Sequence, residues 1–241
     1  MKFSRFYICL LFCSFQLFYL NGQSFVTPQQ DVKVRTDSVI NLYFSNQYKE
    51  LAIYNGRLFR GHEYGIKGHG FYFSSDWQKG NVLYEGIWYN DIPMRYDIFK
   101  DQLMVNHPNN ITIILFGERV QEFHFTGMDF FRFNPGIKNE PAAKIYQLLS
   151  DGKIKIYARR SKILEENLEN KKVEKKFIDA HKFYLVKDGN FHLIRNKNSI
   201  LNLLSDRRQE IKKELKKSNI RFKTDPEKAI IHIADFYNQS H

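Results

Sequence analysis

The sequence predicts an α+β fold, in which a mostly antiparallel, aromatic-rich β-sheet is followed by a C-terminal hairpin and two or three covering helices. Three observations support this fold class. Residues 38–134 are rich in Phe, Tyr, Trp and Ile, the side chains that favour a pleated, half-buried surface. Residues 183–194 have the pattern of a hairpin, and residues 200–237 carry apolar side chains at helical spacing.

The first 22 residues have the organisation of a cleavable secretory signal peptide. Lys2 and Arg5 supply positive charge, residues 6–20 are uncharged and largely apolar, and Gly22 is a small residue at the predicted cleavage site. A permanent membrane anchor is the alternative interpretation. The signal peptide is the better prediction, because a helix needs about 20 apolar residues to cross a membrane.

Both cysteines of the chain, Cys9 and Cys13, lie inside the predicted signal peptide. Neither follows the small residues that precede a lipidated cysteine, so we do not expect a lipoprotein. The predicted mature chain, residues 23–241, therefore has no disulfide, no thiol nucleophile and no thiolate metal site. We predict an exported protein, periplasmic or extracellular, that is not integral to the membrane after signal cleavage.

The β-rich part of the predicted domain comprises residues 23–137. Apolar side chains at every second position of residues 92–98 predict one strand, and runs at 111–115, 123–125 and 131–133 predict others. Turns rich in Gly, Asn and Pro separate these runs. Short turns between strands favour antiparallel pairing of neighbours in the sequence.

Residues 138–241 are predicted to complete the same composite domain with a hairpin and a basic helical part, beyond a soft boundary near 135–140. The Asp-Gly pair at 188–189 lies between two apolar runs and predicts a tight hairpin turn. Residues 162–176 are highly charged, which predicts an exposed loop or a protruding hairpin tip. Asp-Pro at 225–226 predicts the start of the last helix, because Asp caps helices and Pro suits the first helical position.

The positive charge of the chain is concentrated in its C-terminal part. Residues 23–140 contain 12 Lys and Arg against 13 Asp and Glu, whereas residues 141–241 contain 23 against 13. The preferred interpretation of the lysines of 171–176 and 212–217 is a solvated surface that aids solubility. The alternative is weak electrostatic contact with an anionic partner, such as lipid head groups, acidic glycans or nucleic acid. Sequence-specific nucleic-acid recognition is not expected, because no aromatic side chains are interleaved with these lysines.

The glycine-rich stretch at 61–70 contains the most suggestive polar side chains, His62, Glu63 and His69. Imidazole and carboxylate groups are suitable zinc ligands. The two histidines are seven residues apart rather than four, and the four glycines of the stretch are incompatible with a stable helix. A flexible loop between strands is therefore the preferred interpretation.

Three carboxylates, Glu85, Asp97 and Asp101, are candidates for the paired acids of a glycoside hydrolase. The preferred interpretation is that they are turn and surface residues. No GxSxG nucleophile motif and no nucleotide-binding glycine motif occurs. We therefore assign no catalytic, cofactor-binding or metal-binding residue, and we expect no cofactor.

Five aromatic residues are candidates for a binding surface for sugars or peptides, although aromatic side chains at strand spacing more often belong to a core. They are Tyr72, Trp77, Tyr84, Trp88 and Tyr89.

Several local segments occur together in this chain. They are Tyr-Glu-Gly-Ile-Trp-Tyr at 84–89, Tyr-Asp at 96–97, a hairpin at 146–157, Phe-Tyr-Leu at 183–185, Asp-Gly at 188–189, Leu-Leu-Ser-Asp at 203–206 and Ala-Asp-Phe-Tyr-Asn at 234–238. With these segments and the signal peptide, the chain resembles a set of uncharacterised exported proteins of Gram-negative bacteria. The resemblance implies an envelope location and one composite fold, and it carries no activity and no site residues.

These observations predict an exported cell-envelope protein that acts as a non-enzymatic binding or structural module, with an envelope protein or a glycan as partner. The alternative is a hydrolase of envelope or extracellular polymers, for which His62, His69 and Asp97 are the candidate residues.

Overall fold

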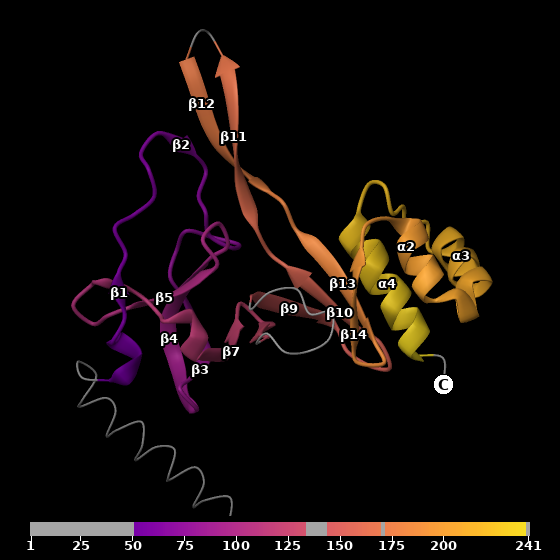
Figure 1. Cartoon of the computed structure of the whole chain (residues 1–241), viewed down its shortest axis with the longest axis horizontal. Helices are drawn as coiled ribbons and strands as arrows, with labels where there is room; N and C mark the ends of the chain where they lie inside the picture. The colour runs from indigo at the N-terminus through magenta and orange to yellow at the C-terminus, as the bar shows by residue number, and fades with distance from the viewer. Residues whose placement is uncertain (1–50, 134–143, 170–171, 240–241) are drawn as a thin grey trace, which may run out of the picture. The chain divides into compact units, whose positions relative to one another are not determined.

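A computed structural model describes residues 51–133, 144–169 and 172–239 (Figure 1). The predicted signal peptide with both cysteines, and the predicted boundary at 135–140, lie outside the described residues. Within them, most strands belong to one antiparallel sheet and three α-helices follow it, which confirms the predicted class of fold. No helix in these ranges is long and apolar enough to cross a membrane.

The larger sheet has eleven strands in the order β1-β6-β5-β4-β3-β7-β8-β9-β10-β13-β14, and all of its pairings are antiparallel. Most neighbours in the sheet are also neighbours in the sequence, because short turns join them. The strands are β1 (Arg57–Leu58), β3 (Gln78–Tyr84), β4 (Ile87–Asp97), β5 (Gln102–Asn106), β6 (Thr112–Ile114), β7 (Val120–Phe125), β8 (Met128–Arg132), β9 (Ile145–Ser150), β10 (Lys155–Arg159), β13 (Lys182–Lys187) and β14 (Asn190–Ile194).

Strand β4 shows how the alternating sequence determines which side chains are buried. Ile92, Met94 and Tyr96 point to one face and are at most 2 % exposed. The strand begins at Ile87, five residues before the predicted run, because its first half pairs with β3 across a bulge. Two short 3₁₀ helices lie in the β-rich part, η1 (Ala52–Tyr54) and η2 (Gly117–Arg119).

The charged segment at 162–176 forms most of a long hairpin rather than a loop (Figure 1). Its strands β11 (Lys162–Glu169) and β12 (Lys172–Asp179) lie between β10 and β13 in the sequence, and β2 (Ile66–Lys67) pairs with β12 in parallel. Glutamates of β11 lie opposite lysines of β12, as at Glu165↔Lys176. These opposite charges stabilise strand pairing where few apolar side chains are available.

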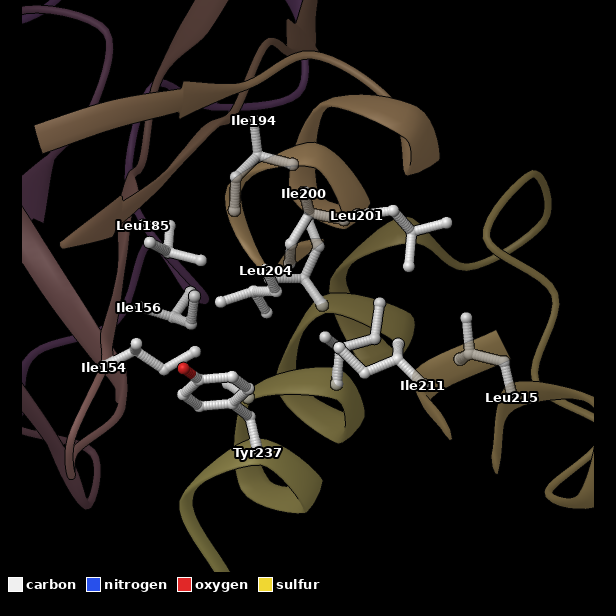
Figure 2. Packing of buried hydrophobic residues seen from close by; sticks show 13 residues of the cluster. Ile154, Ile156, Leu185, Ile194, Ile200, Leu201, Leu204, Ile211, Leu215 and Tyr237 are labelled. Atoms are coloured by element: carbon white, nitrogen blue, oxygen red, sulfur yellow. The ribbon is translucent and has the colours of Figure 1, made fainter. Parts of the chain in front are cut away.

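The helices are α2 (Lys197–Leu203), α3 (Arg208–Lys217) and α4 (Pro226–Gln239), with a short 3₁₀ helix, η3 (Ser205–Arg207), between the first two. They share one buried core with β9, β10, β13 and β14, and Figure 2 shows side chains from the strands meeting those from the helices. The buried members of this core are Ile154, Ile156, Leu185, Ile194, Ile200, Leu201, Leu204, Ile211, Leu215, Ile230, Ile233, Ala234 and Tyr237.

Candidate functional site

Asp97 and His62, two of the weak candidates from the sequence, form a buried pair. Asp97 is the last residue of β4 and is fully buried. Its Oδ2 lies 2.7 Å from Nε2 of His62, and its Oδ1 accepts hydrogen bonds from the backbone N–H groups of Phe99 and Lys100, both at 2.9 Å. Asp97 therefore lies at a turn, as expected, but its carboxylate is buried and has three partners rather than lying at the surface.

Four aromatic rings surround the imidazole of His62, whose side chain is 12 % exposed. Gly70 is required beside it, because a Cβ atom at this position would lie 2.9 Å from the imidazole ring. The arrangement orients the imidazole and ties the 59–72 segment to β4 and β12. The rings, each with its centroid 5.5–5.9 Å from that of His62, are Phe59, Phe71, Phe99 and Phe177.

His69 and Glu63 do not join His62 in a ligand set. The ring of His69 stacks on Phe71 with centroids 6.0 Å apart, and Glu63 forms an exposed ion pair with Lys175. Within the described ranges, no group of three His, Cys, Asp or Glu side chains is arranged to hold a metal ion. The stretch at 61–70 acts here as a connection with a single buried imidazole.

Asp101 and Glu85 are engaged by partners other than Asp97. Asp101 accepts a hydrogen bond from the hydroxyl of Tyr96 at 2.7 Å, and Glu85 forms an ion pair with Arg119 at 2.7 Å. Each of the three carboxylates considered for glycoside hydrolysis is therefore bound by its own basic or hydroxyl group.

Most of the predicted aromatic surface belongs to the interior. Tyr84 and Tyr89 are buried, and Trp77 lies under the guanidinium of Arg95, whose central carbon is 3.8 Å from the ring centroid. Of the five candidates, Trp88 is the exposed one, and its indole stacks on the imidazole of His124 with centroids 5.3 Å apart.

A second buried polar cluster joins the sheet to the last helix. Arg160, directly after β10, is 6 % exposed and donates two hydrogen bonds to Glu227, in the first turn of α4, at 2.6 and 2.5 Å. Its Nε donates to Gln147 at 2.6 Å. Burial opposes the charge of Arg160, and the hydrogen bonds and charge of Glu227 outweigh burial and raise its pKa. Sequence reasoning missed this pair, because its members are 67 residues apart.

His181 lies in the same neighbourhood and accepts a hydrogen bond at Nδ1 from the backbone N–H of Ser161 at 3.2 Å. Burial and the nearby charge of Arg160 lower the pKa of His181. Burial and Lys162 likewise lower the pKa of His69. Both environments favour the neutral imidazole.

These two histidines predict that the protein loses stability on mild acidification. The unfolded chain binds protons more readily than the folded chain, so the free energy of unfolding falls as the pH decreases from about 7.5 through the ordinary histidine pKa of about 6.5 towards the lower folded pKa values. His181→Asn retains an acceptor for Ser161 and should flatten this dependence in urea unfolding between about pH 7.5 and about pH 5.5. Combination with His69→Asn should flatten it further, and an unchanged slope in both variants would contradict the prediction.

The helical part carries a cleft of about 890 Å³ with a basic rim, which we call the basic groove. Its cations come from the start of α2, from α3 and from the connection to α4. Asn219 also lines it and has a left-handed backbone (φ 55°), which suits the end of α3 because Asn tolerates this conformation. The cations are Lys197, Lys212, Lys216, Arg221 and Lys223, and the apolar lining residues are Leu215, Ile220 and Phe222.

The charges of the basic groove are not neutralised by the protein. Its five cations are exposed, and none of them forms an ion pair with a carboxylate in the part of the chain that the structure describes. Lys212 and Lys216 follow each other at a spacing of four, which places both on one side of α3. The groove therefore concentrates positive potential beside an apolar surface.

Comparison of the chain with protein-family models, with curated protein sequences and with solved structures finds no match.

Proposed function

We propose that the chain is an exported, non-enzymatic binding module of the cell envelope that attaches to an anionic partner through the basic groove. The observation that carries this proposal is the convergence of five unneutralised cations from three segments on one cleft. The signal-peptide pattern and the resemblance to exported envelope proteins support the location. Release of the mature chain, residues 23–241, into the periplasm or the extracellular space is part of the proposal.

The physical basis of attachment is the electrostatic attraction between the five cations of the groove and an anionic surface. A lysine or arginine near an anionic surface contributes about 1 kcal/mol, so five of them provide about 5 kcal/mol, which supports reversible attachment without a deep pocket. The attraction is screened by salt, since the Debye length falls from about 10 Å at 0.1 M to about 3 Å at 1 M.

Charge reversal in the groove is expected to abolish most of the binding. The double variant Lys212→Glu and Lys216→Glu removes two attractions, which alone weakens binding to vesicles containing anionic phospholipid roughly 30-fold, and adds two repulsions, so we expect a loss of more than about 30-fold. The matched control reverses two exposed lysines outside the groove, Lys79→Glu and Lys182→Glu. Sedimentation with vesicles at about 0.05 M and about 0.5 M salt measures both.

The control variant distinguishes binding through the charges of the groove from binding through the net charge of the protein. Binding that falls only for the groove variant supports the proposal. Equal losses for both variants would mean that net charge alone drives attachment, and retention of binding by the groove variant would place the contact elsewhere.

The second candidate function is hydrolysis of an envelope polymer, which the 2.7 Å contact between His62 and Asp97 favours. A carboxylate that orients an imidazole is the arrangement of a general base. The four rings packed around the imidazole make the binding proposal the better supported one. Replacement of His62, His69 and Asp97 tests the alternative, which fails if any hydrolytic activity detected for the protein survives in the folded variants.

A further inference from the structure

We propose that the ligand of the basic groove is an amphiphilic anion, a phosphate-bearing lipid in a bilayer, whose head group contacts the cations while Phe222 contacts the apolar region beneath. This inference rests on the proposed function and specifies its ligand. It follows from the composition of the groove, in which basic and apolar side chains occur together.

The apolar side of the groove is continuous with the helical core. Leu215 is a buried member of that core, and Ile220 and Phe222 are partly buried and pack against it. The helical core therefore holds these side chains in position, and the surface that they leave exposed faces the cleft. A partly exposed, supported aromatic side chain beside lysines is the arrangement by which interfacial proteins enter the boundary between head groups and acyl chains.

The basic and apolar side chains alternate along the segment that follows α3. Ile220 and Phe222 are partly buried, whereas Arg221 and Lys223 are exposed. Asn219, with its positive φ, ends the helix and redirects the chain so that this segment lines the same cleft as Lys212. One short segment thus presents both charge and apolar surface to a ligand.

A neighbouring cavity of opposite charge limits where an anion can lie. Asp225, Glu227 and Asp235, together with Lys228, His232 and Ile231, line a cavity of about 480 Å³ that shares Ile220 with the basic groove. Glu227 is paired with Arg160, whereas Asp225 and Asp235 form no ion pair within the described residues and repel a phosphate, so the anionic head group is confined to the lysine and arginine side of Ile220.

The apolar residues distinguish a lipid from other polyanions. A polysaccharide presents hydroxyl groups, which lose hydrogen bonds against Leu215 and Ile220 without replacement. Single-stranded nucleic acid binds to series of stacking aromatic rings, and Phe222 is the one aromatic residue of the groove. A phospholipid satisfies both halves of the groove, since its phosphate and its acyl region are adjacent.

The decisive experiment places a reporter at the proposed depth of insertion. Phe222→Trp in the whole protein is mixed with anionic phospholipid vesicles whose acyl chains carry bromine, and indole fluorescence is compared with that of the parent, which contains Trp77 and Trp88. We expect quenching of the new indole beyond that of the parent. An equal response of the two proteins, once vesicle binding is confirmed, would overturn the inference.

Two further variants separate charge from insertion. Phe222→Asn is expected to weaken vesicle binding about tenfold while binding to the soluble polyanion heparin changes less than about twofold, because only the bilayer offers an apolar region. Phe222→Leu, which keeps an apolar side chain, should retain most vesicle binding, and circular dichroism checks that each variant is folded.

Equal losses of binding to vesicles and to heparin, or tighter binding to heparin or DNA than to vesicles, would overturn the lipid inference and leave the proposed function intact. If instead the Lys212 and Lys216 reversal leaves every one of these ligands bound, the proposed function itself fails.

Discussion

Asp97→Ala is expected to lower the free energy of unfolding by about 3–5 kcal/mol, because removal of one member of a buried polar pair leaves the others without partners. The carboxylate is fully buried and has three partners, the imidazole of His62 and the backbone N–H groups of Phe99 and Lys100. Urea unfolding followed by circular dichroism measures the change.

The chain offers a matched control for this variant. His124 and Asp129 form a second histidine–carboxylate pair, with a 2.5 Å contact, whose side chains are 42 % and 50 % exposed. Asp129→Ala should therefore cost less than about 1 kcal/mol, because water replaces the lost partner. Similar losses for Asp97→Ala and Asp129→Ala would show that the buried pair does not stabilise the fold as we propose.

The Asp97 variant also bears on the alternative function. If the pair is structural, His62→Phe should destabilise the fold as well, because it keeps an aromatic ring at position 62 but leaves the buried carboxylate of Asp97 without the imidazole. A hydrolase would lose its activity in both variants, whatever the stability of each.

Glu227→Ala is the second change with a large expected effect, a loss of about 3 kcal/mol or more in the free energy of unfolding. It removes both carboxylate acceptors of Arg160, which is 6 % exposed and keeps Gln147 as an acceptor, and leaves a buried positive charge without this counter-ion between the sheet and α4. Because this pair connects β10 with the first turn of α4, we also expect faster hydrogen exchange in the last helix. Urea unfolding and exchange mass spectrometry measure these two effects.

Two comparisons isolate the cause. Adding Arg160→Met to Glu227→Ala removes the buried charge that has lost its partner, and it should recover a substantial part of the lost free energy of unfolding. Glu210→Ala breaks the more exposed pair with Arg207 and should cost no more than about 0.5 kcal/mol. A double variant that is less stable than Glu227→Ala alone would contradict the explanation.

Local sequence patterns predicted the class of fold because they reflect local geometry. Alternation in residues 92–98 placed Ile92, Met94 and Tyr96 on one face, and all three are buried in β4. The Asp-Pro pair at 225–226 predicted the start of α4, and the side chain of Asp225 accepts a hydrogen bond from the backbone N–H of Lys228. Each pattern spans only a few residues, and over that span the backbone preference of the residues and the burial of their side chains favour the same structure.

The charged segment at 162–176 was predicted only as one of two alternatives. Its sequence has few apolar side chains, so periodicity does not distinguish a loop from a strand. The strands form because glutamates of β11 meet lysines of β12 across the hairpin, as at Glu166↔Lys175. That complementarity appears only when the two halves are paired in register.

Composition and short-range spacing were enough to predict the antiparallel, aromatic-rich sheet, the helical C-terminal part and the concentration of positive charge there. Which distant side chains meet depends on the tertiary structure. His62 and Asp97 are 35 residues apart and Arg160 and Glu227 are 67 apart, and the register of the strands and the packing of α4 bring them within hydrogen-bond distance. The basic groove depends in the same way on the turn after α3, which adds a segment of alternating basic and apolar residues to the lysines of the helix.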